Sequence, residues 1–537
     1  MSPELFHVLF LESVPEEDIP CFLSLQGIVN RDAPRIYLFP KPDGFEKHWI
    51  EWYKSYGLEG EEVTAENLLS TYANRARGYI VYDPETPDSL NAAIALAGVE
   101  SALVCHPSSA PKLDSLGLSL LADFSGKWEN KISAAQWAVQ NILPRCDLAI
   151  LANYFQEEGP RPFPTMDFLV ARKGFCLGLS VNDADYPDEA RIWDEVQTKA
   201  PDHAMMLGWH TKKDSEATHV YFCSRHNIQV YCAFAWNMSF HQHVKAKKSY
   251  VQEHSRRKRS DPGARYATIT LSDGDSWHSM CDGQKKFWSH PRRGEVPLGW
   301  EVAPIFARVA PAVLEYYYET RTENDYLVCG PSGIGYNYLS GFPDWKGYLR
   351  RSAELMRETS LKTIWTINRV VRHLPGGAIE HQLKGGAISY SRKQMEEFGG
   401  VKDQKGADLV DAEVIERYMK YIPEAYGFFQ GWERIPGENP RIVNGKLWCP
   451  SGALVRDDID AVMREFEESA SAQSLPAFVS AHVNCYKADM DVVIETVRRL
   501  KQKGFSVVKP DEFLRLARDA YERKEESHSD DELSFMM

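Results

Sequence analysis

Short apolar runs alternate regularly with helical patterns along this chain, and this alternation limits the folds that the chain can adopt. Runs rich in β-branched and aromatic residues predict buried strands, and periodic apolar positions between them predict helices. In the C-terminal half, the predicted strands lie at 266–271, 326–329, 362–367, 386–390, 425–429, 477–481 and 505–508. Strands that alternate with helices pair in parallel, so about seven such units over about 250 residues predict a TIM-like (β/α) barrel.

The first 262 residues show the same alternation on a smaller scale. Strand patterns at 35–39, 78–82, 102–105 and 147–151 predict a first α/β domain over residues 1–150. Runs at 175–179, 204–209 and 229–234 predict a second small α/β domain over 151–262, which ends in a basic linker. The predicted fold is therefore α/β, with two N-terminal Rossmann-like domains, a C-terminal barrel over 263–524 and a disordered acidic tail over 525–537.

Charge and apolar patterning restrict the partners that we expect. The formal net charge is −14, which disfavours nonspecific binding to nucleic acid or to an anionic membrane. No apolar run approaches the length of a membrane-spanning helix, and the acidic N-terminus differs from the basic start of a signal peptide. The ten cysteines are scattered without a CxxC pair, which is typical of a reducing compartment. We therefore expect a cytoplasmic protein that acts on a small molecule or carbohydrate, with its oligomeric state left open.

The carboxyl end of the first predicted barrel strand carries the strongest chemical signal. Active-site residues of (β/α) barrels lie at the carboxyl ends of the strands and in the loops that follow. Asp273 and Asp275 come directly after the strand at 266–271, with Gly274 between them. Two carboxylates this close can form an acid/base pair or hold a divalent cation. The alternative is a capped turn, in which the Asp and Ser side chains only accept hydrogen bonds from backbone N–H groups.

Other strand ends supply further candidates by the same rule. Glu301, Glu433 and His482 are candidate catalytic residues, because carboxyl and imidazole groups can transfer protons. Aromatic residues make up 12% of the chain, and several stand beside these carboxylates, where they can stack on sugar rings. The candidate substrate-binding residues are Trp277, Trp300, Ser332, Tyr336, Tyr338, Asn368, Arg369, Trp432 and Tyr486. Structural roles remain open for Glu301, which can favour a helix N-terminus, and for His482, which can be a buried hydrogen-bonding group.

Several segments, in order along the chain, resemble the GxGYxYP family of glycoside-hydrolase-like proteins. The signature is the run GIGYNY at 333–338, and the segments SLQGIVNR at 24–31, NMS at 237–239, SDGDS at 272–276 and LGWE at 298–301 agree with it. The resemblance implies N-terminal α/β domains, a C-terminal TIM-like barrel and a hydrolase activity. Two residues depart from the family pattern: Leu339 replaces the signature proline, and Ser276 replaces the asparagine that follows Asp-Gly-Asp.

Three functions are compatible with these residues. The leading hypothesis is a hydrolase of a sugar-containing or polyhydroxylated substrate that requires no cofactor, with one carboxyl group as acid and another as base or nucleophile. The first alternative is a deacetylase-like hydrolase or lyase that depends on a divalent metal ion, which Asp273, Asp275 and His482 would bind. The second alternative is a carbohydrate- or metabolite-binding protein without catalysis.

Overall fold

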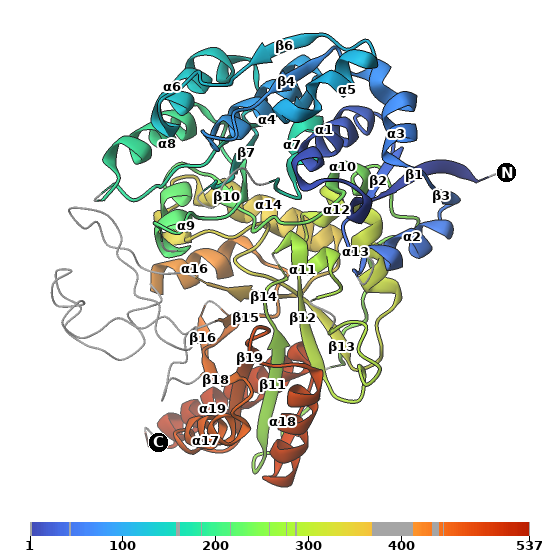
Figure 1. Ribbon diagram of the computed structural model, residues 1–537. Coiled ribbons are helices and arrows are strands. Elements are labelled where there is room, and N and C mark those ends of the chain that lie inside the picture. The colour runs from blue at the N-terminus through green and yellow to red at the C-terminus, as the bar shows by residue number, and fades with distance from the viewer. Residues whose placement is uncertain are drawn as a thin grey trace.

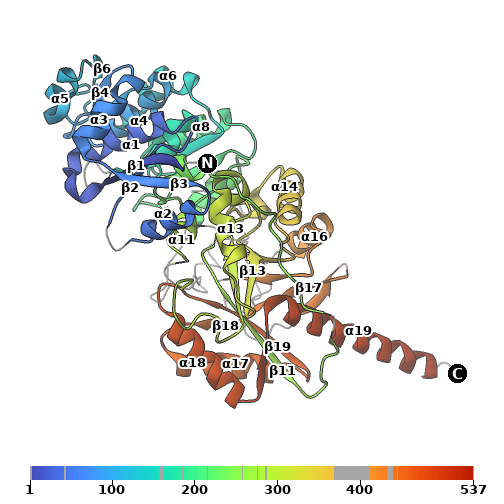
Figure 2. The ribbon, with the colours of Figure 1, turned by 90° about the vertical axis from the view of Figure 1, so that its right-hand side faces the viewer.

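The computed structural model describes residues 3–41, 44–156, 162–183, 185–214, 216–256, 258–274, 276–284, 287–367, 412–431, 440–443 and 445–535 (Figure 1). In these residues, three small parallel sheets form the N-terminal half and one large sheet forms the C-terminal half. The small sheets and their helices lie together at the top of the molecule, and the large sheet lies below them (Figure 2).

Two three-stranded sheets occupy the segment that the sequence predicts as one α/β domain, residues 1–150. Their strand orders are β2-β1-β3 and β5-β4-β6. Helix α1 is buried along nearly its whole length, which explains why its apolar residues show little amphipathic pattern. The elements are β1 (Glu4–Phe10), α1 (Ile19–Val29), β2 (Ile36–Phe39), α2 (Glu46–Lys54), β3 (Leu58–Glu62), α3 (Ala65–Tyr72), β4 (Tyr79–Val81), α4 (Ser89–Glu100), β5 (Leu103–Cys105), α5 (Ala110–Ser115), β6 (Leu120–Asp123) and α6 (Lys131–Asn141).

The third sheet has the strand order β10-β9-β7-β8, and all its pairs are parallel. The chain adds β8 on one side of β7 and then β9 on the other, so it reverses its winding direction as doubly wound domains do. The elements are β7 (Ile150–Asn153), α7 (Met166–Arg172), β8 (Phe175–Leu177), α8 (Pro187–Lys199), β9 (Met205–Gly208), α9 (Glu216–Ser224), β10 (Gln229–Val230) and α10 (Met238–His241).

A buried hydrogen-bonded network joins the first and third sheets. The side chain of Asn237 donates to the main-chain oxygen of Leu38 at 2.9 Å and accepts from its N–H at 2.8 Å, so it imitates a neighbouring strand. Its oxygen also accepts from Gln26 at 2.7 Å, and Asn30 donates to Ser239 Oγ at 3.1 Å. The NMS and SLQGIVNR segments therefore hold these two parts of the chain together.

Ten strands in the described part of the chain form the C-terminal sheet, in the order β16-β17-β15-β14-β13-β12-β11-β19-β18, with β20 also paired to β11. Its strands are β11 (Arg265–Leu271), β12 (Leu298–Val302), β13 (Asp325–Cys329), β14 (Thr363–Thr366), β15 (Gly427–Gln430), β16 (Arg441–Val443), β17 (Lys446–Cys449), β18 (Ser451–Val455), β19 (Ala477–Val483) and β20 (Phe505–Val507). Its helices are α11 (Trp277–Cys281), α12 (Phe306–Val309), α13 (Pro311–Glu319), α14 (Trp345–Glu358), α16 (Ala412–Tyr421), α17 (Ile459–Ser471), α18 (Met490–Gln502) and α19 (Pro510–Phe535).

The order of these strands is that of a (β/α) barrel over much of the sheet. Strands β11 to β15 follow one another in the sheet and are parallel, as the alternation predicts. Within the described residues, no pairing joins β18 to β16 or β17, so closure of the barrel stays a prediction. The predicted strand at 386–390 lies outside the described residues. Thr270 of β11 pairs with Gly299 of β12 and with His482 of β19, so the carboxyl ends of three strands meet at one edge.

Helix α19 continues through Phe535, into the segment 525–537 that its composition predicts to be disordered. The start of the helix is fixed by the buried side chains Phe513, Leu514 and Ala517. Once packing has formed the first turns, a helix extends at little cost through residues with high helix propensity such as Glu, Arg and Lys. Neither α19 nor any other helix in the described part of the chain is both long and apolar enough to cross a membrane.

Candidate active site

The loop after β11 places Asp273 at the carboxyl edge of the C-terminal sheet. Asp273 has a left-handed backbone conformation with φ of 73°, and its main-chain oxygen accepts from Ser276 N–H at 3.1 Å. The next residue, Gly274, packs so closely on the main chain of Glu301 that a side chain at this position would overlap the Glu301 carbonyl group. The loop therefore depends on glycine for a close contact between two strand ends.

Glu301 lies on strand β12 and is only 1% exposed. The sequence predicts that Glu301 precedes a helix whose first turn holds Pro304, and the structure shows that Glu301 itself belongs to a strand. A Cβ atom built on Gly330, just after β13, would lie 2.7 Å from the carboxyl carbon of Glu301. The carboxyl group of Glu301 therefore packs directly against the main chain of Gly330. Burial and the nearby Glu301 carboxylate raise the pKa of the Cys329 thiol. Asp273 and Glu301 therefore stand at the ends of two adjacent parallel strands.

Tyr486 binds Asp273 directly. Its hydroxyl donates a hydrogen bond of 2.7 Å to Asp273 Oδ2, although 68% of the residue is exposed. Desolvation of the phenol, followed by the Asp273 carboxylate, raises the pKa of Tyr486 well above its ordinary value. The hydroxyl therefore keeps its proton and donates a charge-assisted hydrogen bond to the carboxylate, which fixes the position of Asp273.

His482 lies at the same edge of the sheet, on β19, and is fully buried. Its Nδ1 is 3.3 Å from Ser451 Oγ, and its ring packs edge-on against Trp365 with centroids 5.5 Å apart. Burial lowers the pKa of His482 to about 3, although the charge of Asp273 opposes this shift. The imidazole is therefore neutral near pH 7. Within the described residues, which leave out Asp275, no three acidic, His or Cys side chains gather closely enough to hold a metal ion.

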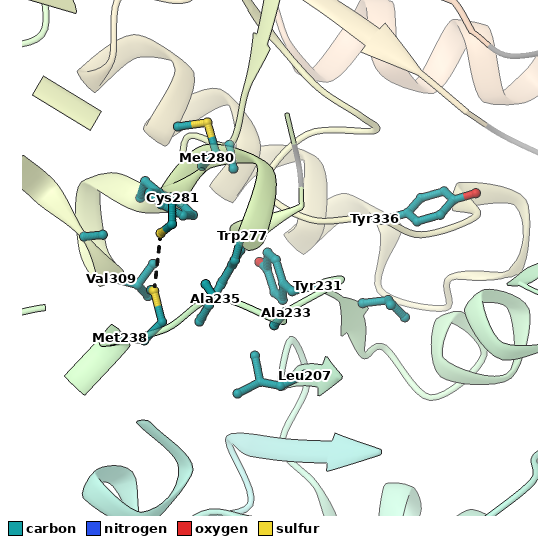
Figure 3. Packing of buried hydrophobic residues seen from close by; sticks show 14 of the residues in the cluster. Leu207, Tyr231, Ala233, Ala235, Met238, Trp277, Met280, Cys281, Val309 and Tyr336 are labelled. Atoms are coloured by element: carbon teal, nitrogen blue, oxygen red, sulfur yellow. Dashed lines mark hydrogen bonds between the residues drawn. The ribbon is translucent and has the colours of Figure 1, made fainter. Parts of the chain in front are cut away.

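Trp277 and Trp300 are expected to stack on substrate, but the structure places both in the core. Both are fully buried. Trp277 packs edge-on against Phe168 of α7, with ring centroids 5.6 Å apart, and lies among side chains of the third sheet in Figure 3. Trp300 donates to Asp325 at 2.8 Å and packs on Trp288. Because a stacking platform needs a face open to ligand, these rings act in packing instead.

The signature loop after β13 also has a clear structural role. Ser332 has φ of 65°, and its hydroxyl donates to main-chain oxygens. Tyr336 pairs through its backbone with Val230 of β10, and Tyr338 is fully buried. The Tyr336 hydroxyl donates to Glu216 of α9 at 2.6 Å. The sequence predicts a substrate-lining loop here, and the structure shows a loop that attaches the third sheet to the C-terminal sheet.

The same contact brings residues to the site that sequence reasoning missed. The main-chain oxygen of Cys232, just after β10, accepts from Trp277 N–H at 3.1 Å and lies 3.3 Å from Nδ1 of His278. Both partners belong to helix α11, which starts after the Asp273 loop. No local pattern marks Cys232, because it belongs to the third sheet and reaches helix α11 only through the contact between the two sheets. Five predicted site residues lie outside the described residues: Asp275, Asn368, Arg369, Trp432 and Glu433.

Sequence models of one family match most of the chain. The models described as the first, second and third GxGYxYP N-terminal domains match residues 20–74, 76–147 and 152–243, in agreement with the three small sheets. The model described as "GxGYxYP putative glycoside hydrolase C-terminal domain" matches residues 263–518. No curated protein matches the chain.

A solved structure is similar over almost the whole length. It is described as a "putative hydrolase" from Bacteroides thetaiotaomicron VPI-5482, with 19% identity and a TM-score of 0.77. The similarity covers 96% of this chain and 94% of that chain. At this level of identity, the likeness shows a shared fold.

Proposed function

Because the chain belongs to the GxGYxYP family, we propose that it is a hydrolase that acts on a sugar-containing or polyhydroxylated substrate. The observation that carries this proposal is the pair of carboxyl groups, Asp273 and Glu301, at the ends of adjacent parallel strands. Hydrolysis of a glycosidic bond needs one carboxyl group to protonate the leaving oxygen and another to act as base or nucleophile.

The two carboxyl groups differ in their surroundings, and this difference assigns their roles in the proposal. Glu301 is buried against Gly330, and a carboxyl group shielded from water is suited to deliver a proton. Asp273 is only half-buried and accepts a hydrogen bond from Tyr486, which suits a carboxylate that acts as base or nucleophile. Asp275 and Glu433 remain the next candidates from the sequence.

The proposal is tested by removing each carboxylate while keeping its shape. We expect Asp273→Asn and Glu301→Gln each to lower kcat by about a hundredfold or more on a glycoside that the wild type cleaves. Glu323→Gln, an exposed carboxylate away from this edge, serves as the matched control and keeps full activity. If both site variants fold and keep full activity, the assignment fails.

One observation supports the metal-dependent alternative. His482 of β19 is buried at the same edge of the sheet as Asp273, where both side chains would bind a divalent ion, and burial keeps the imidazole neutral, as a metal ligand must be. If a divalent ion is the cofactor, the purified protein contains near-stoichiometric metal, and a chelator abolishes activity that added metal restores. Activity that persists in a metal-free preparation rules this alternative out. Sugar binding without turnover of any substrate would instead favour the non-catalytic alternative.

A further inference from the structure

The aromatic rings in the described part of the chain are buried or half-buried with one exception, which lies at the candidate active site. Among the described residues, Tyr486 is the only Phe, Tyr or Trp that is exposed, at 68% of its surface. A ring with both faces covered cannot expose this much surface, so the ring of Tyr486 has an open face. Trp277 and Trp300, which the sequence also places beside the carboxylates, are fully buried.

The hydroxyl group of Tyr486 holds this exposed ring beside Asp273. It donates to Asp273 Oδ2 at 2.7 Å, and its oxygen is bonded directly to the ring. Desolvation is the largest cause of the raised pKa of Tyr486, which indicates that the hydroxyl end of the side chain is shielded while the rest of the ring is open. A ligand that packs on the ring therefore lies next to the Asp273 carboxylate.

The turn that carries Tyr486 is fixed by its own hydrogen bonds. Asn484, just after β19, is only 2% exposed, and its Oδ1 accepts from Tyr486 N–H at 3.1 Å. Asn484 N–H donates to the Val455 carbonyl at 3.0 Å, and the Lys487 carbonyl accepts from Asp457 N–H at 2.8 Å, which ties the turn to the end of β18. Because the backbone and the hydroxyl are both held, the ring loses little conformational entropy when a ligand binds.

We propose that the open face of Tyr486 is the surface on which a pyranose ring of the substrate packs, next to Asp273. This inference rests on the proposed function and narrows its substrate class to a pyranoside. A pyranose has one face made mainly of C–H groups, and an aromatic ring is complementary to it. Since the hydroxyl of the same side chain holds Asp273, sugar binding and the orientation of the carboxylate depend on one residue.

The two ends of this side chain can be tested separately. Tyr486→Phe keeps the ring and removes the hydroxyl, whereas Tyr486→Leu removes both. Binding is measured by calorimetry with a panel of methyl α- and β-hexopyranosides. We expect Kd to stay within about twofold of wild type in Tyr486→Phe and to rise about tenfold in Tyr486→Leu, which is the size of one aromatic contact.

Turnover gives a second readout, with the matching 4-nitrophenyl pyranosides. We expect KM to rise about tenfold in Tyr486→Leu only, and kcat to fall equally in both variants, because both lose the hydrogen bond to Asp273. A residue that only stabilises the fold would not separate KM from kcat in this way. Because Tyr486 is exposed, we expect both variants to fold, which thermal unfolding checks.

Two controls make the same changes away from the site. Tyr79→Phe removes a tyrosine–aspartate hydrogen bond of the same length, 2.7 Å to Asp114, in the second small sheet. Tyr72→Leu removes a half-buried ring at the end of α3. We expect both control variants to keep the wild-type Kd, KM and kcat.

Each other outcome has a defined meaning. An unchanged Kd in folded Tyr486→Leu overturns the inference. An equal loss of affinity in Tyr486→Phe and Tyr486→Leu also overturns it, because binding would then depend on the hydroxyl. A wild-type protein that binds methyl pyranosides but hydrolyses no glycoside contradicts the proposed function and leaves the binding test intact. A wild-type protein that binds no pyranoside but hydrolyses another polyhydroxylated substrate overturns the inference and leaves the proposed function standing.

Discussion

The buried carboxyl group of Asp167 makes stability depend on pH in a way that one substitution can isolate. Asp167, in the first turn of α7, is fully buried, and its Oδ2 accepts from Ser239 N–H at 2.8 Å. Its Oδ1 has no hydrogen-bond partner among the described residues. Burial raises the pKa of Asp167 to about 7, although the hydrogen bond from Ser239 opposes the shift. The neighbouring Cys281 and Tyr154 stay neutral, because burial raises both their pKa values.

The sign and size of the effect follow from this shift. An unfolded Asp ionises near pH 4, whereas Asp167 in the folded protein stays protonated up to about pH 7. The contribution of Asp167 to the free energy of unfolding is therefore fully present below about pH 4 and is lost as the pH rises toward 7. Each tenfold change in proton affinity corresponds to about 1.4 kcal/mol, so the total loss is about 4 kcal/mol.

The substitution Asp167→Asn removes the titration and keeps the shape. We expect the unfolding free energy of this variant, relative to wild type, to rise by about 4 kcal/mol between pH 4 and pH 8. The assay is urea-induced unfolding followed by tryptophan fluorescence at several pH values. Asp188→Asn, which makes the same change at an exposed position, is the control. If the unfolding free energies of wild type and Asp167→Asn differ by a constant amount over this pH range, Asp167 does not titrate as the structure indicates.

Two further predictions concern the network between the sheets and the catalytic carboxylate. Asn237→Ala removes the partner of the buried backbone groups of Leu38 and of the buried amide of Gln26. We therefore expect the free energy of unfolding, measured with a chemical denaturant, to fall by about 3 kcal/mol or more. Asn141→Ala, at an exposed position, is the control and has little effect. Tyr486→Phe removes the hydrogen bond to Asp273. We expect kcat to fall on the order of tenfold, with KM nearly unchanged. An unchanged kcat would show that Tyr486 does not position the carboxylate.

Local sequence patterns predict a large part of the fold. The predicted strand at 266–271 is β11, the one at 326–329 is β13, and the one at 477–481 is β19, each within two residues of its observed ends. The patterns do not predict strand β12, because Gly299 and Glu301 interrupt its apolar run. Nor do they predict the split of residues 1–150 into two sheets, since periodicity shows that strands exist and does not show which of them pair.

The family membership expected from the motifs is confirmed, and the structure changes what several of those motifs do. The signature tyrosines and the NMS segment attach the N-terminal sheets to one another and to the C-terminal sheet, so they act in domain packing. A motif identifies residues that a family keeps together, but only their contacts show whether they touch a ligand or another part of the chain.

The order of residues along the chain is enough to establish that parallel strands alternate with helices and that Asp273 follows the end of a strand. Because parallel strands share a carboxyl edge, this order also predicts that Asp273, His482 and Tyr486 lie close together. Which aromatic rings remain accessible at that edge depends on tertiary packing. Trp277 is covered because the third sheet packs on it, whereas the ring of Tyr486 stays exposed. Whether an aromatic side chain at a strand end is buried depends on residues far away in the chain, and a local sequence pattern cannot predict those contacts.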